Sequence, residues 1–229
     1  MAASAQTLVL FDIDGTLIHT AQAGLRGMNA AFQRLHGRNN ALEGVSFAGR
    51  TDRAITADIF RNLAIEPTDD AILELRDAYL EALAIEIARP VENPGGVFAG
   101  VHALLAELEA RDDIAVGLLT GNFVGGAAIK LGHFDLWRRF RFGAFGDGHY
   151  DRRDLVPVAL AASRAHGIDV DASRTVIIGD TPLDIECAHA HGAHAIAVAT
   201  GPFTVAQLAH ADVVVPTLEA VDAASLARR

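Results

Sequence analysis

Short apolar runs that each end in polar residues constrain the fold of this chain more than any other feature. The clearest runs are residues 8–11, 114–119 and 175–178, and helical spacing of apolar residues follows each of them. Fully apolar runs of this length are typical of strands buried on both faces, and their alternation with helices predicts a parallel sheet. We therefore expect an α/β fold with a Rossmann-like core and helices on both faces of the sheet.

The first apolar run ends in Asp12 and Asp14, with Gly15 directly after them. Side chains alternate along a strand, so two carboxylates separated by one residue project in the same direction. Two close carboxylates repel each other unless a cation or a proton lies between them. The pair therefore indicates a metal site, an acid/base pair, or both. Calcium loops begin similarly, but they need further oxygen ligands that residues 16–20 do not begin to supply.

Polar residues follow the other two apolar runs in the same way. The second run ends in Thr120, Gly121 and Asn122, and the third leads to Asp180 and Asp184. Right-handed crossovers place the carboxyl ends of parallel strands at one edge of a sheet, where ligands usually bind. The Thr120 hydroxyl and the backbone N–H groups at the following helix start suit an anion. We expect all of these groups to meet at one edge of the sheet.

Three converging carboxylates, from Asp12, Asp14 and Asp180, suit a hard cation with oxygen ligands. Mg²⁺ fits best, because it takes one or two carboxylates together with substrate phosphate and water. Arg152 or Arg153, before a predicted helix, can supply local positive charge in the geometry suited to phosphate. A metal, an anion site, a guanidinium and carboxylates together predict phosphoryl transfer, in which electrostatics and positioning carry most of the catalysis.

A helical block separates the first strand from the others. Helices are expected at about 20–35, with Thr20 as the cap, at about 51–63 and at about 67–88, and no strand is expected within the block. The breakers in residues 90–96 mark a linker. The sequence thus predicts a catalytic core formed by residues 1–19 and 91–229 and a helical cap formed by residues 20–90.

The composition limits the possible partners. The chain has 229 residues, 51% of them hydrophobic, and a net charge of −10. An acidic chain is a poor partner for nucleic acid or anionic lipid. The single Cys187 excludes an internal disulfide and a Cys-rich zinc site. Residues 1–6 carry no signal-peptide pattern, and no apolar run is long enough to span a bilayer. We expect a cytoplasmic monomer or homodimer that acts on a small molecule.

Three motifs, in order, resemble those of the haloacid dehalogenase superfamily of phosphohydrolases. Residues 12–17 resemble the first family motif, residues 118–122 the second and residues 179–184 the fourth. The resemblance extends over nearly the full chain, and the block at 20–90 is similar to the family's inserted cap. It implies a Mg²⁺-dependent phosphatase that hydrolyses a small phosphorylated metabolite, phosphoglycolate-like or a sugar phosphate, through an aspartyl-phosphate intermediate.

The same resemblance implies roles for individual residues. Asp12 is the implied nucleophile, and Asp14 is the implied general acid/base. Thr120, with Gly121 and Asn122, is implied to bind the phosphoryl group. The implied metal-binding residues are Asp12, Asp14 (also through its backbone carbonyl), Asp180 and Asp184.

The third motif departs from the commoner family pattern, which has a lysine. The chain's single lysine, Lys130, comes only ten residues after Thr120, and we expect it to be a solvated helix residue. Arg152 or Arg153 comes at the expected place, and Arg152 is the better candidate. In the cap, Arg50 is the residue expected to hold an acidic group of the substrate.

Alternatives remain open at this point. A phosphosugar mutase of the same family would carry the same motifs, and a dehalogenase would not need Asp14 to protonate a leaving group. A signalling receiver domain also uses an acceptor aspartate on a parallel sheet, although not on the first strand. A non-catalytic phosphate-binding protein would have no need of Asp12, Asp14, Thr120 and Asp180 together.

Overall fold

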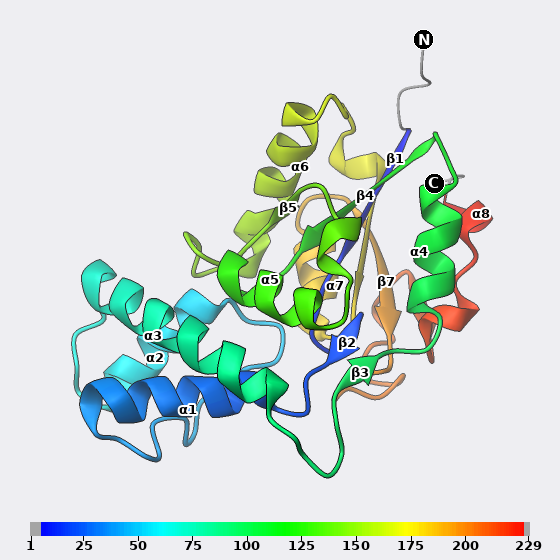
Figure 1. The fold of residues 1–229 in the computed structure, drawn as a ribbon. Helices are drawn as coiled ribbons and strands as arrows, with labels where there is room; N and C mark the ends of the chain where they lie inside the picture. The colour runs from blue at the N-terminus through cyan, green and yellow to red at the C-terminus, as the bar shows by residue number, and fades with distance from the viewer. Residues whose placement is uncertain (1–5, 227–229) are drawn as a thin grey trace.

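A six-stranded parallel sheet forms the centre of the computed structural model, which describes residues 6–226 (Figure 1). The expected absence of a signal peptide concerns mainly residues 1–5, which lie outside this range. The strand order is β5-β4-β1-β6-β7-β8, so the first strand of the chain lies in the middle of the sheet. The strands are β1 (Thr7–Phe11), β4 (Ile114–Leu119), β5 (Gly143–Ala144), β6 (Thr175–Gly179), β7 (His194–Val198) and β8 (Val213–Val215).

Helices cover both faces of this sheet, as predicted. Side chains alternate along β1, so Val9 and Phe11 pack into one apolar cluster while Leu8 and Leu10 pack into another. Each fully buried side chain of this kind stabilises the fold by roughly 1.5–3 kcal/mol. One face is covered by α4 (Val101–Glu109), α5 (Val124–His133) and α8 (Ala223–Leu226), and the other by α6 (Leu155–Ala165) and α7 (Pro182–His189).

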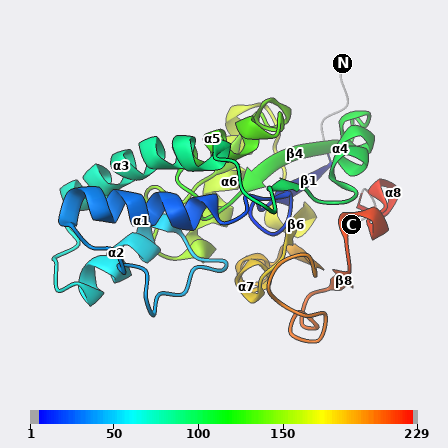
Figure 2. The same cartoon turned by 60° about the horizontal axis from the view of Figure 1, so that its bottom comes forward.

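A helical block lies beside the sheet, with an apolar cluster of its own (Figures 1 and 2). It consists of α1 (Ala23–His36), α2 (Asp52–Asn62) and α3 (Asp69–Ala88). The helices α1 and α3 pack closely, since a Cβ on Gly27 would lie 3.1 Å from the backbone of Leu83. The side chains of Thr51 and Thr68 cap α2 and α3.

A short two-stranded antiparallel ribbon joins the block to the sheet region. Here β2 (Ile18–His19) pairs antiparallel with β3 (Gly96–Val97). The sequence did not predict this ribbon, because its two strands of two residues each carry no periodicity and meet only in the tertiary structure.

One local prediction needs correction. Thr20 does not cap the first helix, because α1 begins at Ala23 after Gln22, whose left-handed φ of 64° turns the chain without a side-chain cap. The strand β5 is short, because only Gly143 and Ala144 pair with β4. Within residues 6–226, no helix combines the length and the apolar character needed to cross a membrane.

Candidate active site

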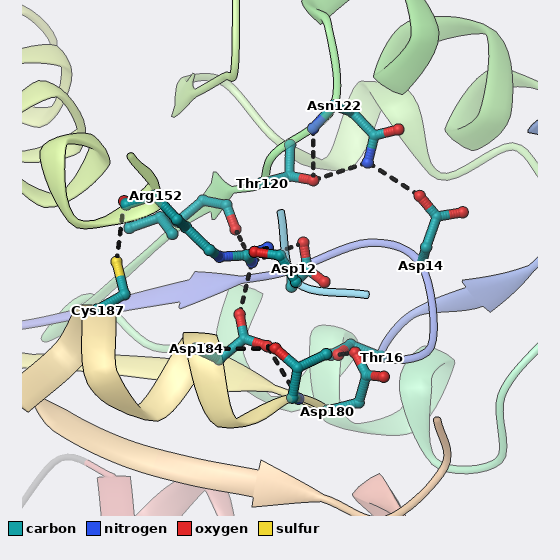
Figure 3. A network of polar contacts seen from close by, with 12 residues as sticks. Asp12, Asp14, Thr16, Thr120, Asn122, Arg152, Asp180, Asp184 and Cys187 are labelled. Atoms are coloured by element: carbon teal, nitrogen blue, oxygen red, sulfur yellow. Dashed lines mark hydrogen bonds and ion pairs between the residues drawn. The ribbon is translucent and has the colours of Figure 1, made fainter. Parts of the chain in front are cut away.

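The carboxylate of Asp12 lies at the carboxyl end of the central strand β1 (Figure 3). The strands β4 and β6 flank β1, so the polar residues after all three strands meet around it. Burial raises the pKa of Asp12 to about 6, although the neighbouring Arg152 opposes the shift. A carboxylate with a cation beside it and a pKa below neutral is mostly ionised at neutral pH.

Arg152 supplies the positive charge of the site from the short 3-10 helix η2 (Arg152–Asp154). Its Nη2 lies 2.9 Å from Asp12 Oδ1 and 2.5 Å from Asp184 Oδ1. Its side chain is 5% exposed, whereas that of Arg153 is 59% exposed and pairs with Asp151. Of the two arginines, the structure therefore places Arg152 in the site and Arg153 at the surface.

Three carboxylates converge beneath this guanidinium. Ligand atoms of Asp12, Asp180 and Asp184 lie within 4.8 Å of one another, and all three side chains are buried. Burial, together with the negative charges of Asp184 and Asp12, raises the pKa of Asp180 to about 9. Thr16 donates a hydrogen bond from Oγ1 to Asp180 Oδ1 at 3.2 Å. Buried carboxylates that repel one another, with oxygen as the donor atom, fit a small divalent cation.

Two glycines let the backbone pass close to this cluster. A Cβ on Gly15 would lie 2.3 Å from Asp180 Oδ2, and one on Gly201 would lie 1.7 Å from the same atom. Gly15 also has a φ of +85°, which side chains rarely adopt. The turn after β1 therefore requires glycine for both its conformation and its close approach to Asp180.

Asp184 serves the local helix as well as the site. It lies in the first turn of α7, where Thr181 and Asp184 form a reciprocal capping box. Its Oδ2 accepts hydrogen bonds from the backbone N–H and the hydroxyl of Thr181, which leaves Oδ1 for Arg152. Asp184 therefore contacts the start of α7 and the guanidinium of Arg152 through different oxygens.

The side chain of Asp14 lies apart from the other three carboxylates. Its Oδ2 accepts hydrogen bonds from Asn122 Nδ2 at 2.9 Å and from Lys130 Nζ at 2.6 Å. The structure therefore brings Asp12, Asp180 and Asp184 together and directs the Asp14 side chain to a different partner. Metal binding by Asp14 through its backbone carbonyl stays a prediction.

The prediction that Lys130 is a solvated helix residue is wrong. It is buried on α5, and its ammonium contacts Asp14 and, at 2.6 Å, Asn122 Oδ1. The periodicity of α5 alone did not reveal this burial, because helices from a distant part of the chain cover this face. One available signal was that a chain with 19 basic residues uses lysine only here.

The second motif forms the opposite side of the site. Thr120 is fully buried, and its Oγ1 accepts hydrogen bonds from Asn122 at the side-chain nitrogen, 2.8 Å, and at the backbone nitrogen, 3.3 Å. A Cβ on Gly121 would lie 2.0 Å from the carbonyl oxygen of Arg50, so the helical block approaches this loop closely. Binding of a phosphoryl group here stays a prediction.

A cavity of about 480 Å³ lies between the sheet edge and the helical block. Leu25, Met28, Phe47 and Ile55 give the block's side an apolar wall. The polar residues that line the cavity include Asp12, Asp14, Thr120, Asn122, Lys130, Arg152 and Asp180. Arg50 also lines the cavity, but its guanidinium is paired with Asp58 at 2.5 Å. Any acidic group of a substrate would therefore compete with Asp58 for Arg50.

Comparison with known proteins agrees with this geometry. The family model for haloacid dehalogenase-like hydrolases matches residues 9–189. A protein from Dickeya dadantii (strain 3937), described as probable phosphatase IndB, is 30% identical over 223 residues, which cover 93% of this chain and 91% of that one.

Solved structures share the fold. CbbY from Rhodobacter sphaeroides, in complex with phosphate, aligns with a TM-score of 0.74 and 19% identity over 98% of this chain and 100% of that one. A beta-phosphoglucomutase from Clostridium difficile aligns with a TM-score of 0.71 and 14% identity over 98% and 96%.

This protein belongs to the haloacid dehalogenase-like hydrolase family. The family membership and the fold class predicted from the motifs are thereby confirmed, and the predicted enzyme class, a phosphoric monoester hydrolase, agrees with the relatives. The three-carboxylate cluster supports a metal-binding site without identifying the metal.

Proposed function

We propose that this protein is a Mg²⁺-dependent phosphatase that hydrolyses a small phosphorylated metabolite through an aspartyl-phosphate at Asp12. The observation that carries the proposal is the position of Asp12, which is both a member of the buried carboxylate cluster and an ion-pair partner of Arg152. That arrangement suits phosphoryl transfer, because groups of positive charge stabilise the charge on the phosphoryl oxygens in the transition state.

In the first half-reaction, a carboxylate oxygen of Asp12 attacks phosphorus and the bond from phosphorus to the substrate oxygen breaks. Asp14 gives its proton to that leaving oxygen. In the second half-reaction, Asp14 takes a proton from water, the water oxygen attacks phosphorus, and the bond to Asp12 breaks. Phosphate leaves, and both aspartates return to their starting states.

Other residues have supporting roles in this proposal. Arg152 holds Asp12 in place and offsets its charge, and Thr120, with the backbone of Gly121 and Asn122, receives the phosphoryl oxygens. Asp12 and Asp180 would hold Mg²⁺ together with the backbone carbonyl of Asp14. Asp184 would contact the Mg²⁺ through water. A bound Mg²⁺ supplies positive charge that neutralises the phosphoryl group.

The proposed substrate is a small phosphate ester of the phosphoglycolate or sugar phosphate type. The cavity volume of about 480 Å³ supports a small molecule. CbbY from Rhodobacter sphaeroides was solved with phosphate, and a single-site mutant of that protein was solved with xylulose-(1,5)-bisphosphate. We also propose that the protein is cytoplasmic and that residues 20–90 act as a cap over the site.

The test is phosphate release from a panel of phosphorylated metabolites, with Mg²⁺ and with a chelator. We expect Mg²⁺-dependent release from a few related compounds. Transfer of phosphate between positions of a sugar, with no net release, would instead favour the phosphosugar mutase. Folded protein that neither releases nor transfers phosphate, and that binds phosphate without turnover, would favour the non-catalytic alternative.

A further inference from the structure

Lys130 contacts Asp14, the proposed general acid/base. The proposed mechanism does not explain this contact. Its side chain is 7% exposed, and Nζ donates to Asp14 Oδ2 and to Asn122 Oδ1, each at 2.6 Å. Asn122 in turn donates through Nδ2 to the same Asp14 oxygen at 2.9 Å. Three side chains thus form a closed triangle of hydrogen bonds, in which Asp14 Oδ2 accepts from both neighbours.

This triangle contributes little to the net stability of the fold. A buried ammonium loses its hydration, and an ion pair that replaces the lost water contributes little net stability. The Asp14 side chain is meanwhile 42% exposed and lines the cavity. One side of this carboxylate is therefore held by protein groups while the other stays open to a ligand.

Helices of the block enclose Lys130 from above. A Cβ placed on Gly24 of α1 would lie 3.6 Å from both Lys130 Nζ and the hydroxyl of Tyr79 on α3. Burial alone would lower the pKa of Lys130, but Asp14, Tyr79 and Asp52 together raise it above the ordinary range. The side chain therefore keeps its charge, and the helical block shields the ammonium of Lys130 from bulk water.

We propose that Lys130 is a positioning residue for proton transfer: with Asn122, it holds Asp14 Oδ2 so that the other carboxylate oxygen faces the leaving group. This inference rests on the proposed function, in which Asp14 protonates the leaving oxygen as its bond to phosphorus breaks. Lys130 neither gains nor loses a proton in the cycle. Its effect is geometric, because proton transfer requires the carboxyl group within hydrogen-bond reach of the leaving oxygen.

The experiment is a leaving-group series with the Lys130→Met protein in saturating Mg²⁺. Methionine keeps the length of the side chain and removes the ammonium. We measure kcat/KM for phosphate esters of 4-nitrophenol, phenol and a simple alkyl alcohol. Alkyl alcohols leave only with a proton, so we expect a loss of about 10²-fold for the alkyl ester and less than about 10-fold for the 4-nitrophenyl ester. An equal loss for all esters, or no loss, would overturn the proposal.

Arg53→Met is the matched control. Arg53 lies on α2 with its side chain 12% exposed, and it also joins the helical block to the core, by donating to the carbonyl oxygen of Asp147 at 3.2 Å. Its carboxylate partner is Asp69 instead of Asp14. This substitution removes a comparable cation at the same junction, so it reproduces a loss of stability or docking. We expect its dependence on the leaving group to match that of the wild type.

A structural readout separates this inference from the proposed function. If the wild-type protein hydrolyses no phosphate ester, the proposed function fails. Crystal structures of the wild-type and Lys130→Met proteins still show whether Lys130 fixes the position of the Asp14 carboxylate. An Asp14 carboxylate that turns away or occupies several positions without Lys130 supports the positioning role. A carboxylate that keeps its place would overturn it.

Discussion

The carboxylate of Asp52 accepts a hydrogen bond from the backbone N–H of Phe123 at 2.8 Å. Asp52 is the first residue of α2, and Phe123 is the N-cap of α5, so the contact joins the helical block to the core. The backbone N–H of Asp52 also donates to the carbonyl oxygen of Gly121 at 2.7 Å. A carboxylate is favourable at a helix N-terminus, and here the helical block itself provides it.

Asp52 makes the stability of the metal-free protein depend on pH. Burial raises its pKa from 3.8 to about 6, although Lys130 and the Phe123 N–H oppose the shift. Folding therefore favours the protonated form, and this stabilisation is complete below about pH 4 and lost as the pH rises through about 6. Asparagine carries no charge at any pH. We expect the unfolding free energy of Asp52→Asn, relative to wild type, to rise over that range in urea titrations; parallel curves would contradict this.

Asp12→Asn should abolish turnover and preserve the fold. Asparagine keeps the shape of the side chain but is a far weaker nucleophile, so we expect kcat to fall by at least ~10³-fold. Phosphate release and thermal unfolding measure the two effects. Asp169→Asn, at an exposed carboxylate paired with Arg164, is the control and should remain active. Substantial activity in Asp12→Asn would remove Asp12 from the nucleophile role.

Arg152→Ala should reduce activity far more than Arg153→Ala. Removal of Arg152 leaves Asp12 and Asp184 buried without their cation, which costs about 3–5 kcal/mol when a buried pair is broken. We expect both a lower melting temperature and a loss of about 10²-fold or more in kcat/KM. Arg152→Lys, which restores a positive charge, should recover part of both. The opposite order for the two alanine variants would reassign the third motif to Arg153.

Mg²⁺ should raise the melting temperature of the wild-type protein, because a cation that binds only the folded chain stabilises it. A chelator should reverse the increase and abolish phosphate release. Asp180→Asn removes one of the three clustered carboxylates and should lose most of the Mg²⁺-dependent increase. Calorimetric scans with and without metal provide the measurement. An identical Mg²⁺ effect in the two proteins would place the metal elsewhere.

Arg50→Ala should raise KM for substrates with a second acidic group and leave KM for a generic aryl phosphate nearly unchanged. Arg50 lines the cavity, and a substrate anion could displace its partner Asp58. Arg61→Ala is the matched control, because Arg61 pairs with the other oxygen of Asp58 at 2.7 Å and is mostly exposed. If Arg50→Ala changes KM equally for both substrate types, Arg50 has no role in specificity.

Local sequence pattern was enough to predict individual strands and helices. The apolar run at residues 8–11 predicted a buried strand, which β1 confirms, and the run at β4 begins and ends at the expected residues, Ile114 and Leu119. The helix α2 begins at Asp52, close to the start that was expected at about residue 51. The three motifs identified the family because their carboxylates and hydroxyl follow strands whose carboxyl ends must share one edge.

Contacts between distant segments required the tertiary structure. The packing of η2 against α7 decides which of the two arginines enters the site. Arg152 points inward, where its Nη2 forms ion pairs with Asp12 and Asp184. Lys130 is buried because α1 and α3 cover the face of α5 from which it projects. The spacing of residues within α5 does not indicate this burial.

The sequence by itself thus determined the class of fold, the family and the carboxylates at the sheet edge, because strand alternation and motif order are local properties. Only the tertiary structure decided that the Asp14 side chain leaves the carboxylate cluster for Lys130 and Asn122. Hydrogen bonds and ion pairs act over a few ångströms, so their partners are chosen by packing between segments far apart in the chain.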